Sequence, residues 1–133
     1  MPIVIDANIA VDWFVLDSND RAESALDLVV AEGAIVPALW RWEVQNALRR
    51  LESAGRLRMP ADFIRSELRE LPIVIDSELT SLFGAEATIA KKFNLTVYDA
   101  AYLELALRRH LNIATSDRAL EQSARSAGVY FGT

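Results

Sequence analysis

The sequence contains no cysteine and a single histidine, His110. Disulfide frameworks, zinc ribbons, iron–sulfur clusters and thiol nucleophiles are therefore excluded, and so are metal sites built from several histidines. Glycine and proline are also scarce, with five and four residues among 133. Hydrophobic residues make up 52% of the chain and charged residues 25%. This is a globular composition, and we expect a single domain over residues 1–133.

Long hydrophobic runs are absent as well. Stretches without a charged residue reach only eight residues, as from Gly33 to Trp40, whereas a helix that crosses a bilayer needs roughly 20 apolar residues. The chain is therefore not expected to span a membrane. The residues from Met1 to Asp6 carry no basic side chain before the first acid. Since this is unlike a secretory signal, we expect a cytoplasmic protein.

Positive charge is in the minority. Lys and Arg number 14 against 19 Asp and Glu, which gives a net charge of −5 and an isoelectric point near 4.9. General electrostatic attraction to nucleic acid is therefore not expected. Locally the balance reverses, because five arginines lie between residues 41 and 58. Such a run is usually a solvated helix face, and the alternative is a surface that contacts phosphates.

Short apolar runs rich in β-branched residues alternate with longer helical stretches. The predicted strands lie in residues 3–5, 34–36, 72–75, 112–115 and 128–131. Their apolar residues are continuous, which is typical of parallel strands covered on both faces. The predicted helices lie in residues 8–14, 20–32, 40–54, 61–70, 78–93, 100–110 and 119–127. This alternation favours an α/β fold with helices on both faces of a mostly parallel, five-stranded sheet.

Acidic residues follow three of the predicted strands, as Asp6, Asp76 and Asp117. Ligands of open α/β sheets bind beyond the carboxyl ends of the strands, so these acids are candidates for a binding site. Each also has a structural explanation. An Asp between a strand and a helix caps the helix by accepting its free backbone N–H groups.

Two further acids lie among the apolar residues of predicted helices. Asp99 follows Thr96 at the spacing of a capping box, and its apolar neighbours predict that it is partly buried. Glu43 lies beside a stripe of apolar residues that recur at helical spacing. It is either a boundary residue or a buried carboxylate with a function.

Four segments carry these acids in order along the chain. They are Ile3-Val-Ile-Asp-Ala-Asn8, Val36-Pro-Ala-Leu-Trp-Arg-Trp-Glu-Val-Gln-Asn-Ala-Leu48, Leu95-Thr-Val-Tyr-Asp-Ala-Ala-Tyr-Leu-Glu-Leu-Ala106 and Ala114-Thr-Ser-Asp117. Together they resemble the PIN-domain ribonucleases, and within them the VapC-type toxins of bacterial and archaeal toxin–antitoxin pairs. The resemblance covers essentially the whole chain, and the second segment is the most specific.

The resemblance implies a PIN-like three-layer α/β/α sandwich with strand order 3-2-1-4-5. It also implies that four acids hold one or two divalent cations: Asp6, Glu43, Asp99 and Asp117. Electrostatics gives a separate reason for a cation, because converging carboxylates repel one another and raise their pKa values unless a positive charge is bound. Mg²⁺ suits an all-oxygen site, and Mn²⁺ should substitute for it.

The resemblance extends to residues around the acids. Asn8 stands where many relatives carry Ser or Thr, and Asn8 and Thr115 are expected to support the metal-binding acids by hydrogen bonds. Because an acidic site does not attract RNA by itself, guanidinium groups near the Glu43 helix are expected to position phosphates. The candidates are Arg41, Arg49 and Arg50.

Asp76 follows a run identical to the one before Asp6, Ile-Val-Ile. The implied strand order puts the third strand at the sheet edge, away from the central crevice. We therefore leave Asp76 out of the site. We interpret it as the start of a helix together with Ser77 and Glu78.

The implied function is that of a Mg²⁺-dependent endoribonuclease, the toxin of a pair, neutralised by a cognate VapB-type antitoxin and assembled as a homodimer. One alternative is a PIN-fold nuclease of RNA processing outside such a pair, and another is a non-catalytic RNA- or protein-binding module. A receiver-type signalling domain is disfavoured, because it would need a lysine near its end and the only lysines are Lys91 and Lys92.

Overall fold

The structure is a computed structural model that describes residues 1–78 and 82–132. In these residues four parallel strands form one sheet in the order β3-β2-β1-β4. The strands are β1 (Ile3–Ile5), β2 (Ala34–Val36), β3 (Ile73–Ile75) and β4 (Ile113–Ala114). The predicted parallel arrangement and the order of the first four strands are confirmed.

The predicted fifth strand, residues 128–131, is reduced to a single parallel bridge between Tyr130 and Ile113. The Ile113 N–H donates to the Val129 carbonyl at 2.7 Å, and the Phe131 N–H donates to the Ile113 carbonyl at 2.9 Å. The segment thus lies beside β4, the predicted neighbour. It pairs through one residue because β4 itself offers only two.

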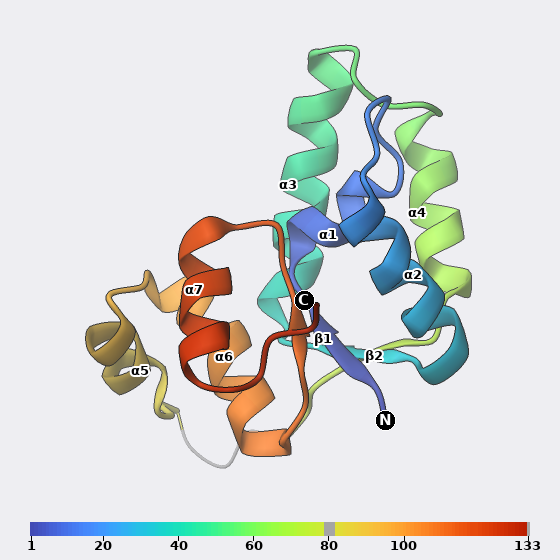
Figure 1. Cartoon of the computed structure of the whole chain (residues 1–133). Helices are drawn as coiled ribbons and strands as arrows, with labels where there is room; N and C mark the ends of the chain where they lie inside the picture. Colours follow the sequence, from blue (N-terminus) through green and yellow to red (C-terminus); the bar gives the residue numbers. More distant parts are fainter. Residues whose placement is uncertain (79–81, 133) are drawn as a thin grey trace.

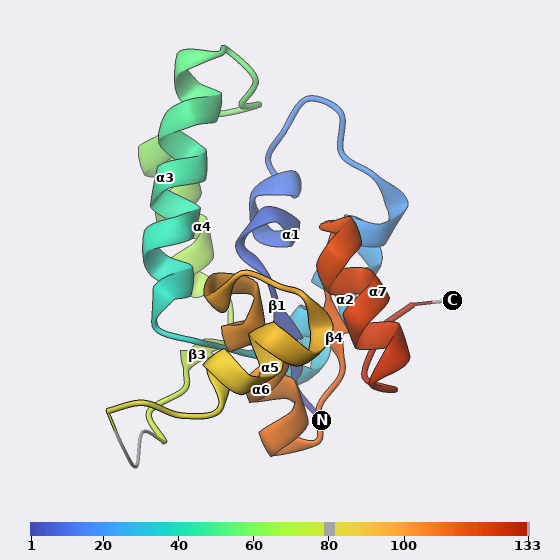
Figure 2. The same ribbon diagram turned by 90° about the vertical axis from the view of Figure 1, so that its left-hand side faces the viewer.

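Helices cover both faces of the sheet and complete three layers (Figure 1). They are α1 (Ala7–Asp12), α2 (Asp20–Glu32), α3 (Leu39–Ser53), α4 (Ala61–Glu70), α5 (Glu86–Phe93), α6 (Val97–Arg109) and α7 (Arg118–Ser126). Helices α2 and α6 contact β1 from opposite sides, while α3 and α4 form a hairpin beside α1 (Figures 1 and 2). None of the described helices is long and apolar enough to cross a membrane.

The core lies around the two central strands. Every residue of β1 and β2 is buried, which explains why their sequences are continuously apolar. By contrast β3 is the edge strand, and its Val74 and Ile75 are exposed. Gly33 joins α2 directly to β2 with a φ of +86°, and a Cβ there would lie 3.2 Å from the Pro72 carbonyl oxygen. Only glycine fits this turn without strain.

Two predicted helix boundaries were wrong. We predicted a helix over residues 78–93, but α5 begins only at Glu86, and residues 76–78 are not helical. Residues 79–81 of that prediction lie outside the described part of the chain. Helix α6 begins at Val97, three residues before the predicted start, because Thr96 is its cap. The Thr96 hydroxyl accepts the Asp99 N–H at 3.1 Å.

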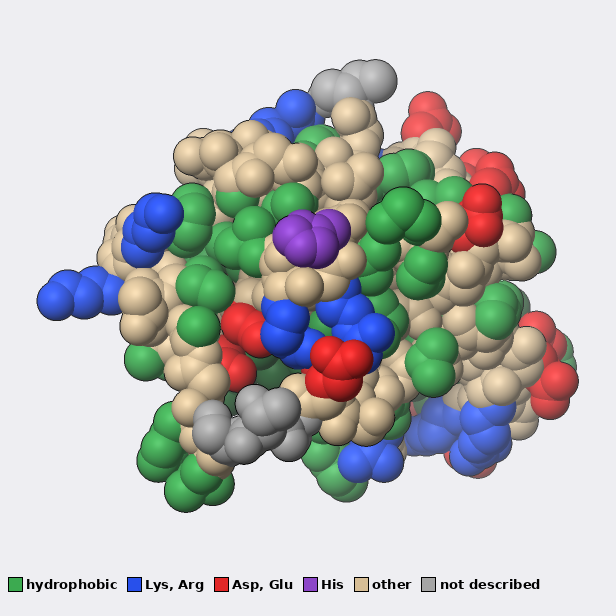
Figure 3. All heavy atoms as spheres, turned by 90° about the horizontal axis from the view of Figure 1, so that it is seen from below, with side chains coloured by type: hydrophobic (Ala, Val, Ile, Leu, Met, Phe, Trp, Pro, Cys, Tyr) green, Lys and Arg blue, Asp and Glu red, His purple; other side chains and the backbone are tan. Residues whose placement is uncertain are grey.

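Asp76 does not begin a helix, contrary to our interpretation, because its carboxylate is bound by two arginines of α6. The Asp76 side chain is 7% exposed and lies 2.6 Å from Arg108 Nη2 and 2.8 Å from Arg109 Nη2. Glu78 and Glu104 also pair with Arg108. Figure 3 shows basic and acidic side chains adjoining at this end of the molecule. The cluster links the end of β3 to the end of α6.

These ion pairs predict that Asp76→Asn destabilises the fold by about 1.5–3 kcal/mol at pH 7, the range for hydrogen bonds to charged groups. Burial alone would raise the pKa of Asp76, but hydrogen bonds from Arg108 and Arg109 hold it below 3.8. A carboxyl group with a lowered pKa stabilises the fold only while it is ionised. The difference between the two proteins, measured by urea unfolding, should therefore shrink as the pH falls below about 4.

The matched control is Asp62→Asn. Asp62 also pairs with an arginine, Arg65, but its side chain is 99% exposed, and exposed ion pairs contribute little. Equal effects of the two substitutions would contradict a stabilising role for the ion pairs of Asp76.

Candidate metal and nucleic-acid site

Two acids at the ends of central strands also cap helices. Asp6 follows β1, and its Oδ1 accepts the Ile9 N–H of α1 at 2.8 Å. Asp117 is the third residue after β4, and its Oδ2 accepts the Leu120 N–H of α7 at 2.8 Å. The two explanations that the sequence left open are therefore compatible. Capping fixes each carboxylate at the carboxyl edge of the sheet.

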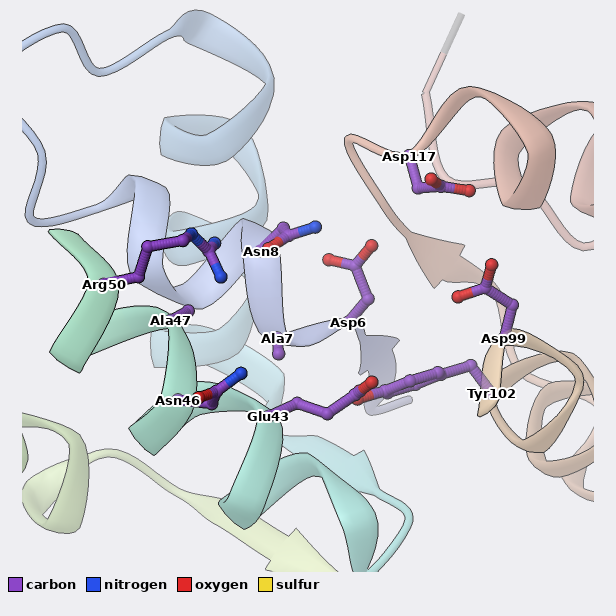
Figure 4. Close-up of a pocket in the computed structure, with 10 residues that line it drawn as sticks. All are labelled: Asp6, Ala7, Asn8, Glu43, Asn46, Ala47, Arg50, Asp99, Tyr102 and Asp117. Atoms are coloured by element: carbon purple, nitrogen blue, oxygen red, sulfur yellow. The ribbon is translucent and has the colours of Figure 1, made fainter. Parts of the chain in front are cut away.

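The four predicted acids line one pocket of about 240 Å³. Glu43 reaches it from α3 and Asp99 from α6, while Asp6 and Asp117 come from the ends of β1 and β4 (Figure 4). The full lining is Asp6, Ala7, Asn8, Glu43, Asn46, Ala47, Arg50, Asp99, Tyr102 and Asp117. Four carboxylates from four separate segments thus face the same space.

Thr115 links the two strand-end acids. Its side chain is fully buried, and its hydroxyl donates to Asp6 Oδ2. The same hydroxyl accepts the Asp117 N–H at 3.0 Å. One buried hydroxyl therefore orients Asp6 and the backbone of Asp117 together, a supporting position like the one predicted for it.

Burial makes the Asp6 carboxylate difficult to ionise. Asp6 is 5% exposed, and this burial raises its pKa from 3.8 to about 6, against the opposing hydrogen bonds from Thr115 and Ile9. The pKa of Asp99 is raised too, first by burial and then by the charges of Asp117 and Glu43. Within residues 1–78 and 82–132, neither carboxylate forms an ion pair like those of Asp76 with Arg108 and Arg109. The pocket therefore favours an external positive charge.

Tyr102 is a site residue that the sequence analysis did not assign. Its hydroxyl donates to Glu43 Oε1 at 2.5 Å, from α6 to α3. Burial and the Glu43 carboxylate both raise the pKa of Tyr102, so the phenol stays a donor. The sequence did contain a signal for Tyr102 as a site residue, because it lies three residues after Asp99 and therefore on the same helix face. Its partner on another helix depended on the tertiary fold.

The carboxylates of the pocket fit a hydrated divalent cation. In the described residues, no three acidic or histidine side chains converge closely enough to hold one ion between them. Both oxygens of Asp6 and one of Glu43 are held by hydrogen bonds within the protein. Mg²⁺ keeps several of its waters when it binds carboxylates, so it needs few direct protein ligands. Asp6, Asp99, Glu43 and Asp117 are the side chains that would hold it, directly or through water.

The structure separates the three arginines that we expected to contact RNA. Arg50 lines the acidic pocket. Arg41 lines a different groove, between α3 and α4, and its guanidinium lies over the ring of Trp42. Arg49 is exposed and lines neither cavity. Asn8 does line the acidic pocket, so it can bond to waters or ligands there.

The raised pKa of Asp6 predicts that Asp6→Asn stabilises the metal-free protein. The ionised carboxylate disfavours the fold, because the group binds its proton more tightly when folded than when unfolded. A difference between 3.8 and about 6 corresponds to roughly 3 kcal/mol at pH 8 and fades as the pH falls toward 4. The check is urea unfolding with a chelator at both pH values.

Asp76→Asn is the control for this prediction, because it should lower stability at pH 8. A loss of stability in metal-free Asp6→Asn at pH 8 would contradict the electrostatic interpretation of the site.

Comparison with known proteins agrees with this geometry. No curated protein sequence matches the chain. Among solved structures, the crystal structure of PAE2754 from Pyrobaculum aerophilum is similar, with a TM-score of 0.63 and 22% sequence identity over 92% of this chain and 86% of that one. The family model of the PIN domain matches residues 3–126. That match spans nearly the whole chain and all four pocket acids, and the chain therefore belongs to the PIN domain family.

Proposed function

We propose that the protein is a metal-dependent endoribonuclease that hydrolyses RNA phosphodiester bonds as the toxin of a toxin–antitoxin pair. The PIN domain is generally a nuclease fold. The observation that supports the proposal for this chain is that four carboxylates line one pocket and that none of the four forms an ion pair within the described residues. Such a pocket suits a divalent cation and, through it, a phosphate.

In this proposal Asp6 and Asp99 would bind Mg²⁺ directly, while Glu43 and Asp117 would bind it directly or through water. When bound, the cation supplies Lewis acidity, which makes a water more acidic and offsets the negative charge of the phosphate. The water oxygen bonds to phosphorus, the bond to the leaving oxygen breaks, and the proton passes to that oxygen. The Thr115 hydroxyl holds Asp6 in place, and the Tyr102 hydroxyl holds Glu43. Mn²⁺ should replace Mg²⁺.

The biological context is part of the proposal. As a toxin, the protein would be held inactive by a VapB-type antitoxin that docks in a groove near the pocket, and it would act as a homodimer. Inducible expression in bacteria is the direct test of toxicity. Arrested growth that requires Asp6 supports the toxin, whereas RNA cleavage without arrest would favour a nuclease of RNA processing.

The nuclease is tested by incubating the purified protein with total RNA and Mg²⁺ or Mn²⁺ and mapping new ends by sequencing. We expect discrete ends that disappear with a chelator. Asp6→Asn and Asp99→Asn should lower the rate on the order of 100-fold or more, because each removes a proposed ligand of the cation. The control is Asp76→Asn, whose side chain follows the same Ile-Val-Ile run but lies outside the pocket.

Folded protein that yields no metal-dependent ends from RNA of several sources would overturn the nuclease and favour a binding module. Loss of cleavage in Asp76→Asn to the same degree as in Asp6→Asn would contradict the assigned site.

The hydrogen bond from Tyr102 to Glu43 predicts that Tyr102→Phe weakens Mg²⁺ binding. The ring keeps its buried position, but Glu43 loses its donor and its fixed orientation. Removing such a supporting bond usually lowers metal affinity or activity about 10- to 100-fold. The Mg²⁺ concentration for half-maximal cleavage should therefore rise in Tyr102→Phe. It should stay unchanged in Tyr98→Phe, since Tyr98 is 67% exposed, and equal values in both variants would refute the role.

A further inference from the structure

The acidic pocket has a second half that the cleavage chemistry does not use. Four of its lining residues lie on one face of α3: Glu43, Asn46, Ala47 and Arg50. Their spacing of three, four and seven residues aligns them along the helix. Figure 4 shows Asp99 and Asp117 on one side of the pocket and Asn46, Arg50 and Asn8 on the other, with Asp6 and Glu43 between. The pocket therefore changes from acidic to neutral and then to basic along α3.

Arg50 has no partner for its charge among residues 1–78 and 82–132. It is exposed, and its guanidinium forms neither a hydrogen bond nor an ion pair there. Arg56, Arg65 and Arg108, by contrast, each pair with a carboxylate. An uncommitted guanidinium at the edge of a pocket is suited to an anionic ligand, and its planar donors match a phosphate.

Arg50 enters the pocket two turns of α3 beyond Glu43. Seven residues of α-helix place the Cα atoms of the two residues about 10 Å apart along the axis. This spacing leaves room along α3 for a second anion beside the one at the acids. Asn46 lies between Glu43 and Arg50 in the same pocket, with an amide that both donates and accepts hydrogen bonds.

We propose that Asn46 and Arg50 form a second subsite, in which Arg50 binds the phosphate next to the one that is cut and Asn46 binds the nucleotide between them. This inference rests on the proposed nuclease function. It gives the RNA strand a path across the protein, from the acidic half of the pocket along α3 toward Arg50. It also assigns Arg50, rather than Arg41 or Arg49, as the phosphate contact. Arg41 lies over Trp42, and Arg49 lies outside the pocket.

The first test measures binding without cleavage. Fluorescence anisotropy would follow a labelled single-stranded RNA with the Asp99→Asn protein in Mg²⁺, at several salt concentrations. Loss of one phosphate contact on a single strand should make the slope of log affinity against log salt shallower by about 0.7. We expect this change on adding Arg50→Gln and no change on adding Arg49→Gln, a matched control on the next residue. Asn46→Ala should weaken binding without changing the slope, because it removes no charge.

The second test locates the phosphate. A short RNA with one mapped cut is prepared with a neutral methylphosphonate at each flanking position in turn. Wild-type protein should show a KM about tenfold higher for one neutral position next to the cut, with kcat changed little. Arg50→Gln should show the higher KM already with the unmodified RNA, and a neutral methylphosphonate at that position should not raise its KM further. Arg49→Gln should resemble the wild type. Both substituted arginines are exposed, so the variants should fold.

The outcomes separate the two proposals. RNA binding with an unchanged salt slope in Arg50→Gln, or sensitivity of Arg50→Gln to every neutral phosphate as in the wild type, would overturn the subsite and leave the nuclease intact. If the wild type neither binds nor cuts RNA, the proposed function fails and the subsite fails with it. A lower kcat at unchanged KM in Arg50→Gln would place Arg50 at the reacting phosphate and also overturn the subsite.

Discussion

The burial of Asp6 at the end of a central strand is the constraint on which the site depends. The residue follows β1, which lies between β2 and β4 in the sheet, and it is 5% exposed. Its oxygens accept hydrogen bonds from Ile9 and Thr115, yet its pKa is still raised to about 6. Hydrogen bonds thus orient the carboxylate without offsetting the loss of solvent. The fold retains a group whose ionised form destabilises it, which is common where function requires the charge.

Two hydroxyl groups extend this constraint to the other acids. Thr115 joins Asp6 to the backbone of Asp117, and Tyr102 joins α6 to Glu43 on α3. Both are at most 1% exposed, so packing fixes their positions. The helices that carry the acids are therefore cross-linked at the pocket itself. The geometry of the carboxylates follows from the core and not from surface loops.

Much of the predicted fold rested on local patterns in the sequence. Buried strands were readable from continuous apolar runs. The positions of acids after strands and within helices gave candidates, and the resemblance to the PIN-domain ribonucleases selected four of them. The fifth strand was predicted over residues 128–131 but forms a single bridge, because its neighbour β4 has only two residues. The helix predicted from residue 78 does not begin there. Asp76 instead pairs with two arginines that lie more than 30 residues away in the sequence. The bond from Tyr102 to Glu43, and the distinction of Arg50 from Arg41 and Arg49, depend on how α3 packs at the pocket, which no local pattern records.

Asp6 and Asp76 show why a motif needs its environment. Each follows Ile-Val-Ile at the end of a parallel strand. At the sheet edge Asp76 meets Arg108 and Arg109, and its pKa is lowered. In the centre Asp6 meets a hydroxyl, a backbone N–H and other acids, and its pKa is raised. The first carboxylate already has its countercharge within the protein. The second forms no ion pair within residues 1–78 and 82–132, and it is the one that lies in the pocket. Identical local sequences therefore reach opposite electrostatic states because the fold gives them different neighbours.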